Sequence, residues 1–475
     1  MPIPNQTIQI QDPGLGLVEP VDTVPLFVGY SSLGTANVIG SFNSVNDLVA
    51  QRGQGPSVED AASTLANAGG PVLHMKLTCS VAGANSSVTE LPGGGPVVSV
   101  TGTANDDYDC KVTIDVGGGL GVARFHYSLD GDYTASETLT VPAGGSFAIA
   151  NSGLTLTFAS GTYVAASVYS FTTTAPMFNA SDLATGFAAI QADLTSWDFI
   201  VASGRQATGS AAATLYAALE SQLNTLQTQH RYVAGMMDAG DEAAATVAAA
   251  FSATTGKRVL RSYRGLRMLS SKPFPGWSMP MRREVAGFAL RAAQSLISTD
   301  LGRFSSGPIP GATAIDHNEY VTETMDQQKF ATMRTWPGYG AQIWITNGRL
   351  PAPAGSDFQY WQYRRVMDVA CRTVYEQQAF MVNAGFRAKA DGTMADEDRI
   401  RWENRINNAL RVRLTQPLNE EGTAGHVSDV QYRIDSTWVI TNTNAIVSAV
   451  AVQPLGYGKF ITTRIGFVSQ FQAAA

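Results

Sequence analysis

The chain is poor in cysteine, histidine and charged residues, on which many common folds and chemistries depend. It holds 3 cysteines and 5 histidines in 475 residues, and only 15% of its residues are charged. Cys79, Cys110 and Cys371 form no Cys-x-x-Cys pair, so neither a disulfide framework nor a zinc site is indicated. A surface this poor in charge indicates that partners cover much of it.

Long apolar runs are also missing. No uninterrupted apolar run approaches the ~18 to 20 residues of a membrane helix. The first six residues, Met-Pro-Ile-Pro-Asn-Gln, have neither the basic start nor the apolar core of a signal peptide. We therefore expect a protein made in a reducing cytosol, with no direct membrane insertion, that leaves the cell by a route other than secretion.

The sequence lacks the short motifs of common enzymes. There is no His-Glu-x-x-His and no Gly-x-Ser-x-Gly, and the histidines never fall within metal-ligand spacing of one another. Asp106, Asp107 and Asp109 could bind Ca²⁺ but lack the Gly and distant Glu of an EF-hand loop, so a solvated acidic turn is the better interpretation. We expect no catalytic residue, no metal and no cofactor.

One segment is similar to a phosphate-binding loop. Gly204 and Gly209 have the Gly-x-x-x-x-Gly spacing between a predicted strand and a predicted helix. Ser210 and Ala211 stand where a P-loop needs Lys for the phosphates and Ser or Thr for Mg²⁺. A plain strand-to-helix turn is favoured, and a nucleotide-binding enzyme stays the alternative.

Charge is divided unequally along the chain. Residues 1–255 hold 6 Lys and Arg against 21 Asp and Glu, a balance of -15, and residues 256–475 hold 26 against 18, a balance of +8. Opposite charge on the two halves suits head-to-tail contacts between copies. Nucleic acid could also use the basic half, but it has no dense Lys/Arg tract, so we expect no direct nucleic-acid binding.

Two groups of arginines account for much of the basic half. One recurs every three residues from Arg258 through Arg261 and Arg264 to Arg267. The other loads one predicted helix and comprises Arg399, Arg401, Arg405, Arg411 and Arg413. Surface solvation is the default interpretation for both. The second group is also a plausible docking face for an acidic partner.

Apolar runs and helical periodicity alternate through the chain. Strands are predicted at residues 24–30, 72–77, 197–202, 232–238 and 258–263. Helices are predicted between them, one opened by a capping box at Ser57 and others at residues 210–227 and 241–251. This alternation predicts a doubly wound, parallel α/β core.

A different composition interrupts this pattern. Residues 90–176 are rich in Gly, Ser, Thr, Val and Asp, and Lys111 and Arg124 are their only basic residues. Short alternating runs separated by turn signals, such as Asp130-Gly131-Asp132, predict a small all-β domain inserted into the first one.

The C-terminal half is predicted to contain three amphipathic helices and then strands. Apolar stripes start near Val285, near Tyr363 and near Trp402, and capping boxes at Ser356 and Thr393 are predicted to open the last two helices. Strands are predicted at residues 427–435, 437–441 and 445–452.

The two ends of the chain are predicted to be strands without a partner beside them. The N-terminal candidates are Ile8 and Ile10, and the C-terminal candidates share one face of a long strand: Ile461, Ile465, Phe467 and Phe471. Exposed strands of this kind aggregate unless something completes their ladders. We infer that they pair with sheets of neighbouring copies by strand addition. Pairing within the same subunit is the alternative.

The order of these parts resembles the contractile tail sheath family of myophages and related injection systems. The resemblance is carried by residues 27–30 (Phe-Val-Gly-Tyr), the inserted β domain, residues 364–368 (Arg-Arg-Val-Met-Asp) and the terminal strand. Its closest local likeness is residues 273–375, with Trp336-Pro337-Gly338-Tyr339-Gly340. It covers nearly the whole chain, although no short motif is diagnostic.

The resemblance implies a mechanism and a set of partners. Sheath subunits form stacked hexameric rings around an inner tail tube, held by donated strands, and are bounded by baseplate and tail terminator proteins. Contraction rearranges the polymer and drives the tube through the host envelope without hydrolysing a ligand. The protein would be assembled in the host bacterial cytoplasm and reside in the virion tail, and the five arginines from Arg399 to Arg413 are candidates to face the tube.

The resemblance also implies a division of the chain. The expected parts are an N-terminal arm (1–20), the first part of an α/β sheath domain (21–89), an outer β domain (90–176), the α/β core (177–350) and a tube-facing domain with a terminal strand arm (351–475). A nucleotide-binding α/β enzyme of ATPase type and a tail fibre or adhesin are the alternatives.

Overall fold

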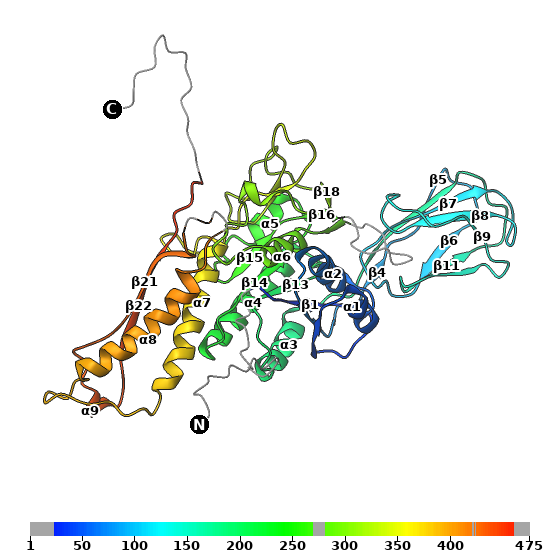
Figure 1. The fold of residues 1–475 in the computed structure, drawn as a ribbon. Helices are drawn as coiled ribbons and strands as arrows, with labels where there is room; N and C mark the ends of the chain where they lie inside the picture. Colours follow the sequence, from blue (N-terminus) through cyan, green and yellow to red (C-terminus); the bar gives the residue numbers. More distant parts are fainter. Residues whose placement is uncertain (1–22, 269–280, 420–421, 423, 460–475) are drawn as a thin grey trace, which may run out of the picture. The chain divides into compact units, whose positions relative to one another are not determined.

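The computed structural model describes residues 23–268, 281–419, 422 and 424–459 (Figure 1). The chain divides into two compact units, with the boundary between Glu376 and Gln377. The predicted strands at Ile8 and Ile10 and at 461–471 lie outside the described residues. None of the helices in the described part of the chain combines the length and apolar character needed to span a bilayer.

A six-stranded sheet forms the centre of the first unit. In spatial order its strands are β15 (Val259–Ser262), β14 (Ala234–Asp238), β13 (Phe199–Ser203), β1 (Pro25–Gly29), β3 (Val72–Lys76) and β2 (Ile39–Phe42). Neighbours pair in parallel, except that β2 pairs antiparallel to β3 at one edge. Every residue of β1, β13, β14 and β15 is buried, as expected for parallel strands covered on both faces.

Helices cover both faces of this sheet. They are α1 (Val45–Arg52), α2 (Pro56–Ala68), α3 (Ala180–Ala192), α4 (Gly209–Thr228), α5 (Ala244–Ala250) and α6 (Glu284–Gln294). Phe27 of β1 lies in one apolar core with α2 and α6, whereas Leu26 and Val28 lie in a second core with α3 and α4. Side chains alternate between the faces of a strand, so one sheet supports two cores. The predicted mixed α/β class is confirmed.

Smaller elements complete this part of the unit. They are β16 (Gly265–Met268) between β17 (Met281–Arg283) and β18 (Ala312–Ile315), the pair β19 (Met333–Arg334) and β20 (Trp344–Ile345), the 3-10 turn η1 (Phe304–Ser306) and helix α7 (Trp361–Gln378). α7 begins in the first unit and its last two residues belong to the second.

Two antiparallel sheets lie between β3 and α3 in the chain. One is β10 (Ser146–Ile149), β11 (Leu154–Phe158) and β6 (Val98–Thr101). The other is β4 (Ala84–Asn85), β12 (Val168–Thr174), β7 (Asp109–Val116), β8 (Arg124–Ser128) and β9 (Leu139–Thr140), with β5 (Thr89–Leu91) also on β12. The sheets enclose their own apolar core, which contains Phe125 and Phe158. We call this segment the inserted β domain.

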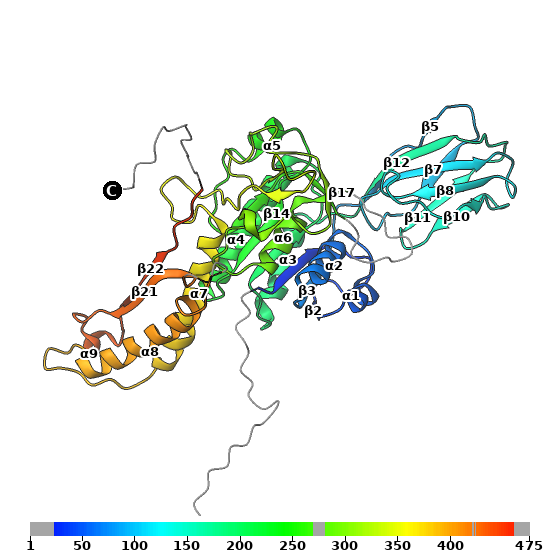
Figure 2. The same ribbon diagram turned by 45° about the horizontal axis from the view of Figure 1, so that its top comes forward.

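The second unit is built from a helix and a hairpin (Figure 2). After the 3-10 turn η2 (Ala379–Met381), its elements are α8 (Asp396–Leu414), β21 (Val427–Ile434), the single turn α9 (Ile440–Thr443) and β22 (Ser448–Pro454). β21 and β22 pair antiparallel as a two-stranded sheet. A strand predicted at residues 437–441 is wrong, because the chain there turns into α9.

The predicted capping boxes are wrong although the helices exist. The N-cap of α2 is Gly55, and the Ser57 hydroxyl donates to the Tyr30 carbonyl instead (2.7 Å). The hydroxyl therefore bonds to the residue that follows β1 and not to the first turn of its own helix.

The capping boxes predicted to open α7 and α8 are absent for a similar reason. Ser356 accepts from the Phe358 N–H in a turn, and α7 begins only at Trp361. The N-cap of α8 is Ala395, and the Thr393 hydroxyl donates to Asp391 (2.7 Å). Short polar side chains bond to whichever local backbone or side-chain group is nearest, so their spacing alone does not fix a helix start.

Candidate partner-binding face on helix α8

Helix α8 carries charge in the order that its dipole favours. Its first turn is acidic, at residues 396–398, and its last turn holds Arg411 and Arg413. Negative charge near the N-terminus and positive charge near the C-terminus stabilise a helix. Every fourth residue from Trp402 to Leu414 is buried, which gives the helix one narrow apolar face.

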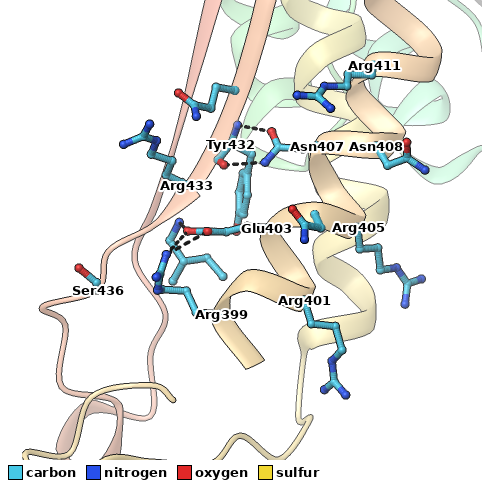
Figure 3. Close-up of a pocket in the computed structure, with 13 residues that line it drawn as sticks. Arg399, Arg401, Glu403, Arg405, Asn407, Asn408, Arg411, Tyr432, Arg433 and Ser436 are labelled. Carbon is cyan, nitrogen blue, oxygen red and sulfur yellow. Dashed lines mark hydrogen bonds and ion pairs between the residues drawn. The ribbon is translucent and has the colours of Figure 1, made fainter. Parts of the chain in front are cut away.

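That face packs beside β21, and two polar side chains of α8 bind the backbone of the strand (Figure 3). Asn407 makes two hydrogen bonds to Tyr432: its amide nitrogen donates to the carbonyl (3.0 Å), and its oxygen accepts from the N–H (2.7 Å). Glu403 accepts from the N–H of Ile434 (2.8 Å). The edge of β21 that faces away from β22 is thereby satisfied by side chains at these positions.

A groove of about 820 Å³ lies along this part of α8 and β21. Most of its lining side chains are basic or amide: Arg399, Arg401, Arg405, Arg411, Arg433, Asn404, Asn407, Asn408 and Gln431. Glu403 is the one acidic residue of that lining, and it is bound to Arg399 (3.0 Å) and to the strand. The groove therefore offers surplus positive charge to a partner.

The structure separates the five predicted arginines. Arg399 points toward β21, where it is paired with Glu403 and with Asp396 (Figure 3). Arg401 and Arg405 point away from the strand on the other side of the helix, and both are exposed (Figure 3). Arg405 stacks on Phe380 with 4.3 Å to the ring centroid.

The last two of the five lie nearer the C-terminal end of the helix. Arg411 is exposed, and Arg413 is half-buried. Arg401, Arg405 and Arg411 are thus the ones presented to solvent, and Arg399 is largely committed to internal pairs.

The acidic end of α8 is neutralised by basic residues of the preceding loop. Arg387 donates to Asp398 through its guanidinium (3.0 Å) and its backbone N–H (2.9 Å), and these bonds lower the pKa of Asp398 to about 2. Lys389 pairs with Asp396 (2.9 Å), which lowers the pKa of that carboxyl. The first turn also pairs with Arg399 and Arg401, so the surplus positive charge of the helix comes from the arginines farther along it.

The loop that is similar to a phosphate loop is a strand-to-helix turn, as favoured from the sequence. β13 ends at Ser203, and α4 begins at Gly209 with Thr208 as N-cap. The Gly209 N–H, which would face a phosphate, donates to the carboxylate of Glu242 (2.6 Å). An anion of the chain itself therefore occupies the position that a phosphate would need.

A buried serine and histidine lie at hydrogen-bond distance but are arranged for packing. Ser57 Oγ is 2.8 Å from His74 Nε2 and donates its single proton to the Tyr30 carbonyl. The imidazole must then donate to the serine, so it is not placed to remove the hydroxyl proton. Burial lowers the pKa of His74 to about 3, which keeps the ring neutral.

The acidic turn of the inserted β domain differs from expectation in one respect. Asp106 is fully buried rather than solvated, and Asp107 accepts from the Ala175 N–H (2.8 Å). In the part of the chain that the structure describes, no group of three or more His, Cys, Asp or Glu side chains could hold a metal ion.

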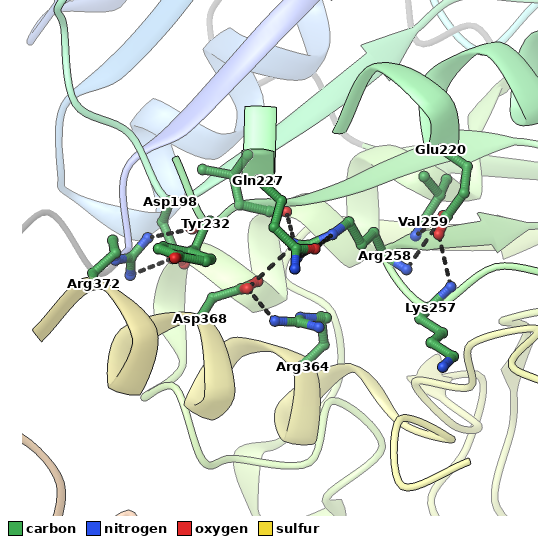
Figure 4. A network of polar contacts seen from close by, with 11 residues as sticks. Asp198, Glu220, Gln227, Tyr232, Lys257, Arg258, Val259, Arg364, Asp368 and Arg372 are labelled. Carbon is green, nitrogen blue, oxygen red and sulfur yellow. Dashed lines mark hydrogen bonds and ion pairs between the residues drawn. The ribbon is translucent and has the colours of Figure 1, made fainter. Parts of the chain in front are cut away.

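Three of the four arginines of the first group are interior, and the fourth, Arg264, is half-buried, which corrects the prediction of surface solvation. Arg258, Arg261 and Arg267 lie on or beside β15 and β16 and are at most 9% exposed. Arg258 pairs with Asp368 of α7 (3.2 Å), which also binds Arg364 (Figure 4). The recurrence every three residues crosses two strands and the turn between them, so it does not describe one solvated helical face.

Among the described residues, Arg261 has no acidic partner. Its guanidinium lies over Phe330 (4.1 Å to the centroid) and Phe251 (5.0 Å), and it donates to Thr254 and to the carbonyl of Gln328. Burial lowers its pKa to about 10. Aromatic faces and carbonyls here replace the carboxylate that a buried cation usually requires.

Asn407 is the functional residue of this face that sequence reasoning missed. Asparagine in the middle of a helix lowers the stability of that helix, because its helix propensity is low. This low propensity is the one signal in the sequence that could have pointed to Asn407. Neither its partner strand nor the register can be derived from that signal.

Comparison with known proteins places the chain in a family and identifies its fold. The family model described as "DUF2586, N-terminal domain" matches residues 3–349. No curated protein matches the chain.

Solved structures are similar over nearly the whole chain. The helical sheath of the anti-feeding prophage (AFP) in its contracted state has a TM-score of 0.54 at 13% identity, covering 98% of this chain and 99% of that one. The PVC sheath complex of an extracellular contractile injection system, also contracted, has a TM-score of 0.53 at 10% identity and covers 98% of both chains. A chain of the 6-fold symmetrised AFP baseplate has a TM-score of 0.52 at 12% identity, covering 98% and 99%.

The resemblance to contractile sheaths inferred from the order of parts is thus confirmed at the level of fold. Because the family model covers most of its length, the chain belongs to the DUF2586 family, with the fold of contractile sheath proteins.

Proposed function

We propose that this chain is a structural subunit of a contractile phage tail sheath, and not an enzyme. In this proposal it polymerises as stacked hexameric rings around an inner tail tube and contracts to drive that tube through the host envelope. The fold likeness to two contracted sheaths supports it, as does the 6-fold symmetry of the AFP baseplate.

The proposal rests on a difference between the two edges of the β21–β22 hairpin: side chains bond to one edge, and the other is uncovered. Asn407 and Glu403 cover the free edge of β21. No strand of the described residues pairs with the outer edge of β22, and its residues are exposed or half-buried. An uncovered edge is a template for a strand from another chain.

The donated strands would be the terminal arms. Ile8 and Ile10 at one end and Ile461, Ile465, Phe467 and Phe471 at the other alternate with other residues as strands with one apolar face do. Each arm would add a strand to a hairpin of a neighbouring copy. The polymer would keep these pairings while its subunits rearrange, so that the work comes from the difference between two packings.

The exposed arginines of α8 are proposed to face the inner tube. Arg401, Arg405 and Arg411 would meet acidic groups of the tube surface, since complementary potentials set orientation. The chain would divide as the resemblance implies, with arms at 1–20 and at the C-terminal end, an outer β domain at 90–176, the α/β sheath domain at 21–89 and 177–350, and a tube-facing domain at 351–475. Baseplate and tail terminator proteins would bound the sheath, which would be assembled in the host bacterial cytoplasm and carried on the virion tail.

Truncation of the C-terminal arm tests the proposal. Removal of residues 461–475 should give a soluble, folded subunit that forms no tubes or sleeves in electron micrographs. Removal of residues 473–475, three alanines, is the matched control and should leave polymers intact. Normal polymers from the longer truncation would overturn strand exchange, and a full-length chain that stays monomeric at high concentration would overturn the sheath role.

A further inference from the structure

A cluster of aromatic residues surrounds one arginine of the first unit. Arg334 of β19 pairs across the strands with Trp344 of β20, so the two side chains lie on the same face of this small sheet. The Arg334 guanidinium lies over the rings of Trp336 (4.0 Å to the centroid) and Tyr320 (5.6 Å). Phe304 stacks on Trp344, with 5.4 Å between the ring centroids, and Tyr339 meets both rings edge-on. We call this group the aromatic–arginine patch: Phe304, Tyr320, Arg334, Trp336, Tyr339 and Trp344.

Most rings of the patch are open to solvent. The exposed fractions are 52% for Tyr320, 52% for Tyr339 and 39% for Phe304, whereas Trp344 beneath them is buried. A single exposed aromatic side chain is ordinary, but tryptophan, tyrosine and arginine are the residue types enriched where proteins bind other proteins. The composition of the patch therefore indicates a surface that binds a polypeptide.

The guanidinium of Arg334 has aromatic neighbours but no acceptor. In the part of the chain that the structure describes, no hydrogen bond or ion pair joins this guanidinium to another residue, and its Nε atom is buried without a hydrogen-bond partner. Buried donors in proteins nearly always have partners. A guanidinium fits a carboxylate especially well, because two parallel N–H···O bonds can form. The patch therefore suits a ligand that brings a carboxylate.

Hydrogen bonds hold the patch in place. The Asn318 side chain accepts from the N–H groups of Tyr320 (3.2 Å) and Thr335 (3.1 Å), and it donates to the Thr335 hydroxyl (2.8 Å). The Glu319 N–H donates to the carbonyl of Met333 in β19 (3.1 Å). Residues 318–320 are thereby fixed beside β19, with the Tyr320 ring next to Arg334. Little conformational entropy would be lost when a ligand binds to rings held in this way.

One segment of the chain outside the described residues has the complementary chemistry. Residues 1–22 contain Asp12, Glu19 and Asp22 but no Lys or Arg. Asp12 and Glu19 each directly precede a proline, and they are the only acidic residues of the chain that do. Residues 15–18 between them supply two leucines and a valine. A residue before proline favours an extended backbone, and extended proline-containing peptides bind surfaces lined by aromatic rings.

We propose that the aromatic–arginine patch binds residues 12–20 of the N-terminal arm. A carboxylate of Asp12 or Glu19 binds the Arg334 guanidinium, and the proline that follows it lies against the rings of Trp336 and Tyr339. Extended at ~3.3 Å per residue, the 22 residues before the first described one span up to about 70 Å. That is about three times the radius of gyration of roughly 23 Å expected for a chain of this length, so the arm is long enough to reach a patch.

This inference goes beyond the proposed sheath and does not depend on it. Strand addition was assigned to Ile8 and Ile10 of the arm, whereas the acidic segment 12–20 follows them in the chain. The patch would thus hold a second part of the same arm, at a site in the first unit.

Zero-length cross-linking of the full chain tests the proposal. Arg334→Lys keeps a positive charge at the patch and provides an amine, which a carbodiimide joins only to a carboxylate in direct contact. Mass spectrometry of the digested chain should find position 334 joined to Asp12 or Glu19, several-fold more often than position 405 in Arg405→Lys. Arg405 is the matched control, because it is exposed and also stacks on an aromatic ring, that of Phe380. Adding Asp12→Asn and Glu19→Gln to Arg334→Lys should remove the cross-link.

Three results would overturn the proposal. They are a cross-link from position 334 only to acidic residues outside 12–20, a yield no higher than that of Arg405→Lys, and a yield unaffected by Asp12→Asn with Glu19→Gln in a chain with unchanged circular dichroism. Electron micrographs separate this test from that of the sheath. Tubes without the cross-link would contradict binding of the arm to the patch alone, and the cross-link in a chain that forms no tubes would contradict the sheath alone.

Discussion

At the scale of single residues, Glu284 is the most unusual group of the described chain. It begins α6, is fully buried, and neither carboxyl oxygen has a hydrogen-bond partner in the described part of the chain. Burial, followed by the nearby carboxyls of Asp238, Glu319 and Asp316, raises its pKa well above the usual range. The folded protein therefore holds this side chain protonated at pH values where the unfolded chain has released the proton.

This gives a pH dependence of known sign. Because the folded pKa is raised, stability is highest below the unfolded value near 4.5 and falls as pH rises toward the folded value, by about 1.4 kcal/mol per pH unit. Glu284→Gln removes that term, so its stability advantage over the natural chain should grow as pH rises above the unfolded value near 4.5. Urea unfolding at several pH values measures it, and an advantage independent of pH would contradict the assignment.

Glu319 is the counterpart of Glu284, because its pKa is shifted in the opposite direction. Hydrogen bonds from His317 and from the backbone N–H groups that follow outweigh the effect of burial and lower its pKa. Its contribution to stability is present above the unfolded pKa and is lost as pH falls through the folded one. Glu319→Gln should therefore destabilise the protein at neutral pH, by about 1–3 kcal/mol, whereas Glu284→Gln should not.

At the scale of elements, the two hydrogen bonds of Asn407 to Tyr432 hold α8 and β21 together. Asn407→Ala removes both bonds and leaves the strand backbone unsatisfied, at a cost of about 1–3 kcal/mol. Asn408→Ala is the control, since that neighbouring side chain is exposed. Amide hydrogen exchange should speed up at Tyr432 in the first variant only, and equal exchange in the two would contradict the role of Asn407.

α7 is attached to the sheet by buried ion pairs, and this too can be tested. Asp198 binds Arg365 (2.9 Å) and Arg372 (3.0 Å), and Asp198 and Arg365 are almost fully buried (Figure 4 shows Asp198 and Arg372). Asp198→Ala leaves buried positive charge uncompensated and should cost about 3–5 kcal/mol. Glu397→Ala breaks an exposed pair and should change stability by less than about 1 kcal/mol in the same thermal melts.

The elements also separate what sequence predicts from what it does not. Apolar runs at residues 24–30, 197–202 and 232–238 correspond to β1, β13 and β14, because strands buried on both faces need uninterrupted apolar residues. The antiparallel edge strand β2 and the pair β10 and β11 were missed, since short strands at an edge or in a small sheet have weak patterns.

The contacts between side chains could not be predicted from these sequence patterns. The arginines from Arg258 to Arg267 looked solvated because charge is normally exposed, and only the fold brings Asp368 from 110 residues away to pair with the first of them. The edge contact of Asn407 likewise depends on a strand that is distant in sequence. On α8 the charge of the candidate face could be predicted from composition, but not which arginines are exposed and which are turned toward β21.

At the scale of the whole molecule, the unequal charge of the two halves predicts a response to salt. If the half at -15 meets the half at +8 of another copy, raising salt from about 0.05 to 0.5 M should shift assembly toward free subunits, because screening weakens exposed charge pairs. Pelleting of polymers at each salt concentration measures the shift. Polymers that strengthen with salt would instead indicate contacts dominated by apolar surface.

The Glu242 carboxylate at the start of α4 has a consequence for the energetics of the proposed device. The turn before α4 binds the Glu242 carboxylate of its own chain, so this turn connects two segments and holds no nucleotide. If the chain forms the proposed sheath, contraction would draw on the difference between two packings of its subunits and not on a nucleotide held at this turn.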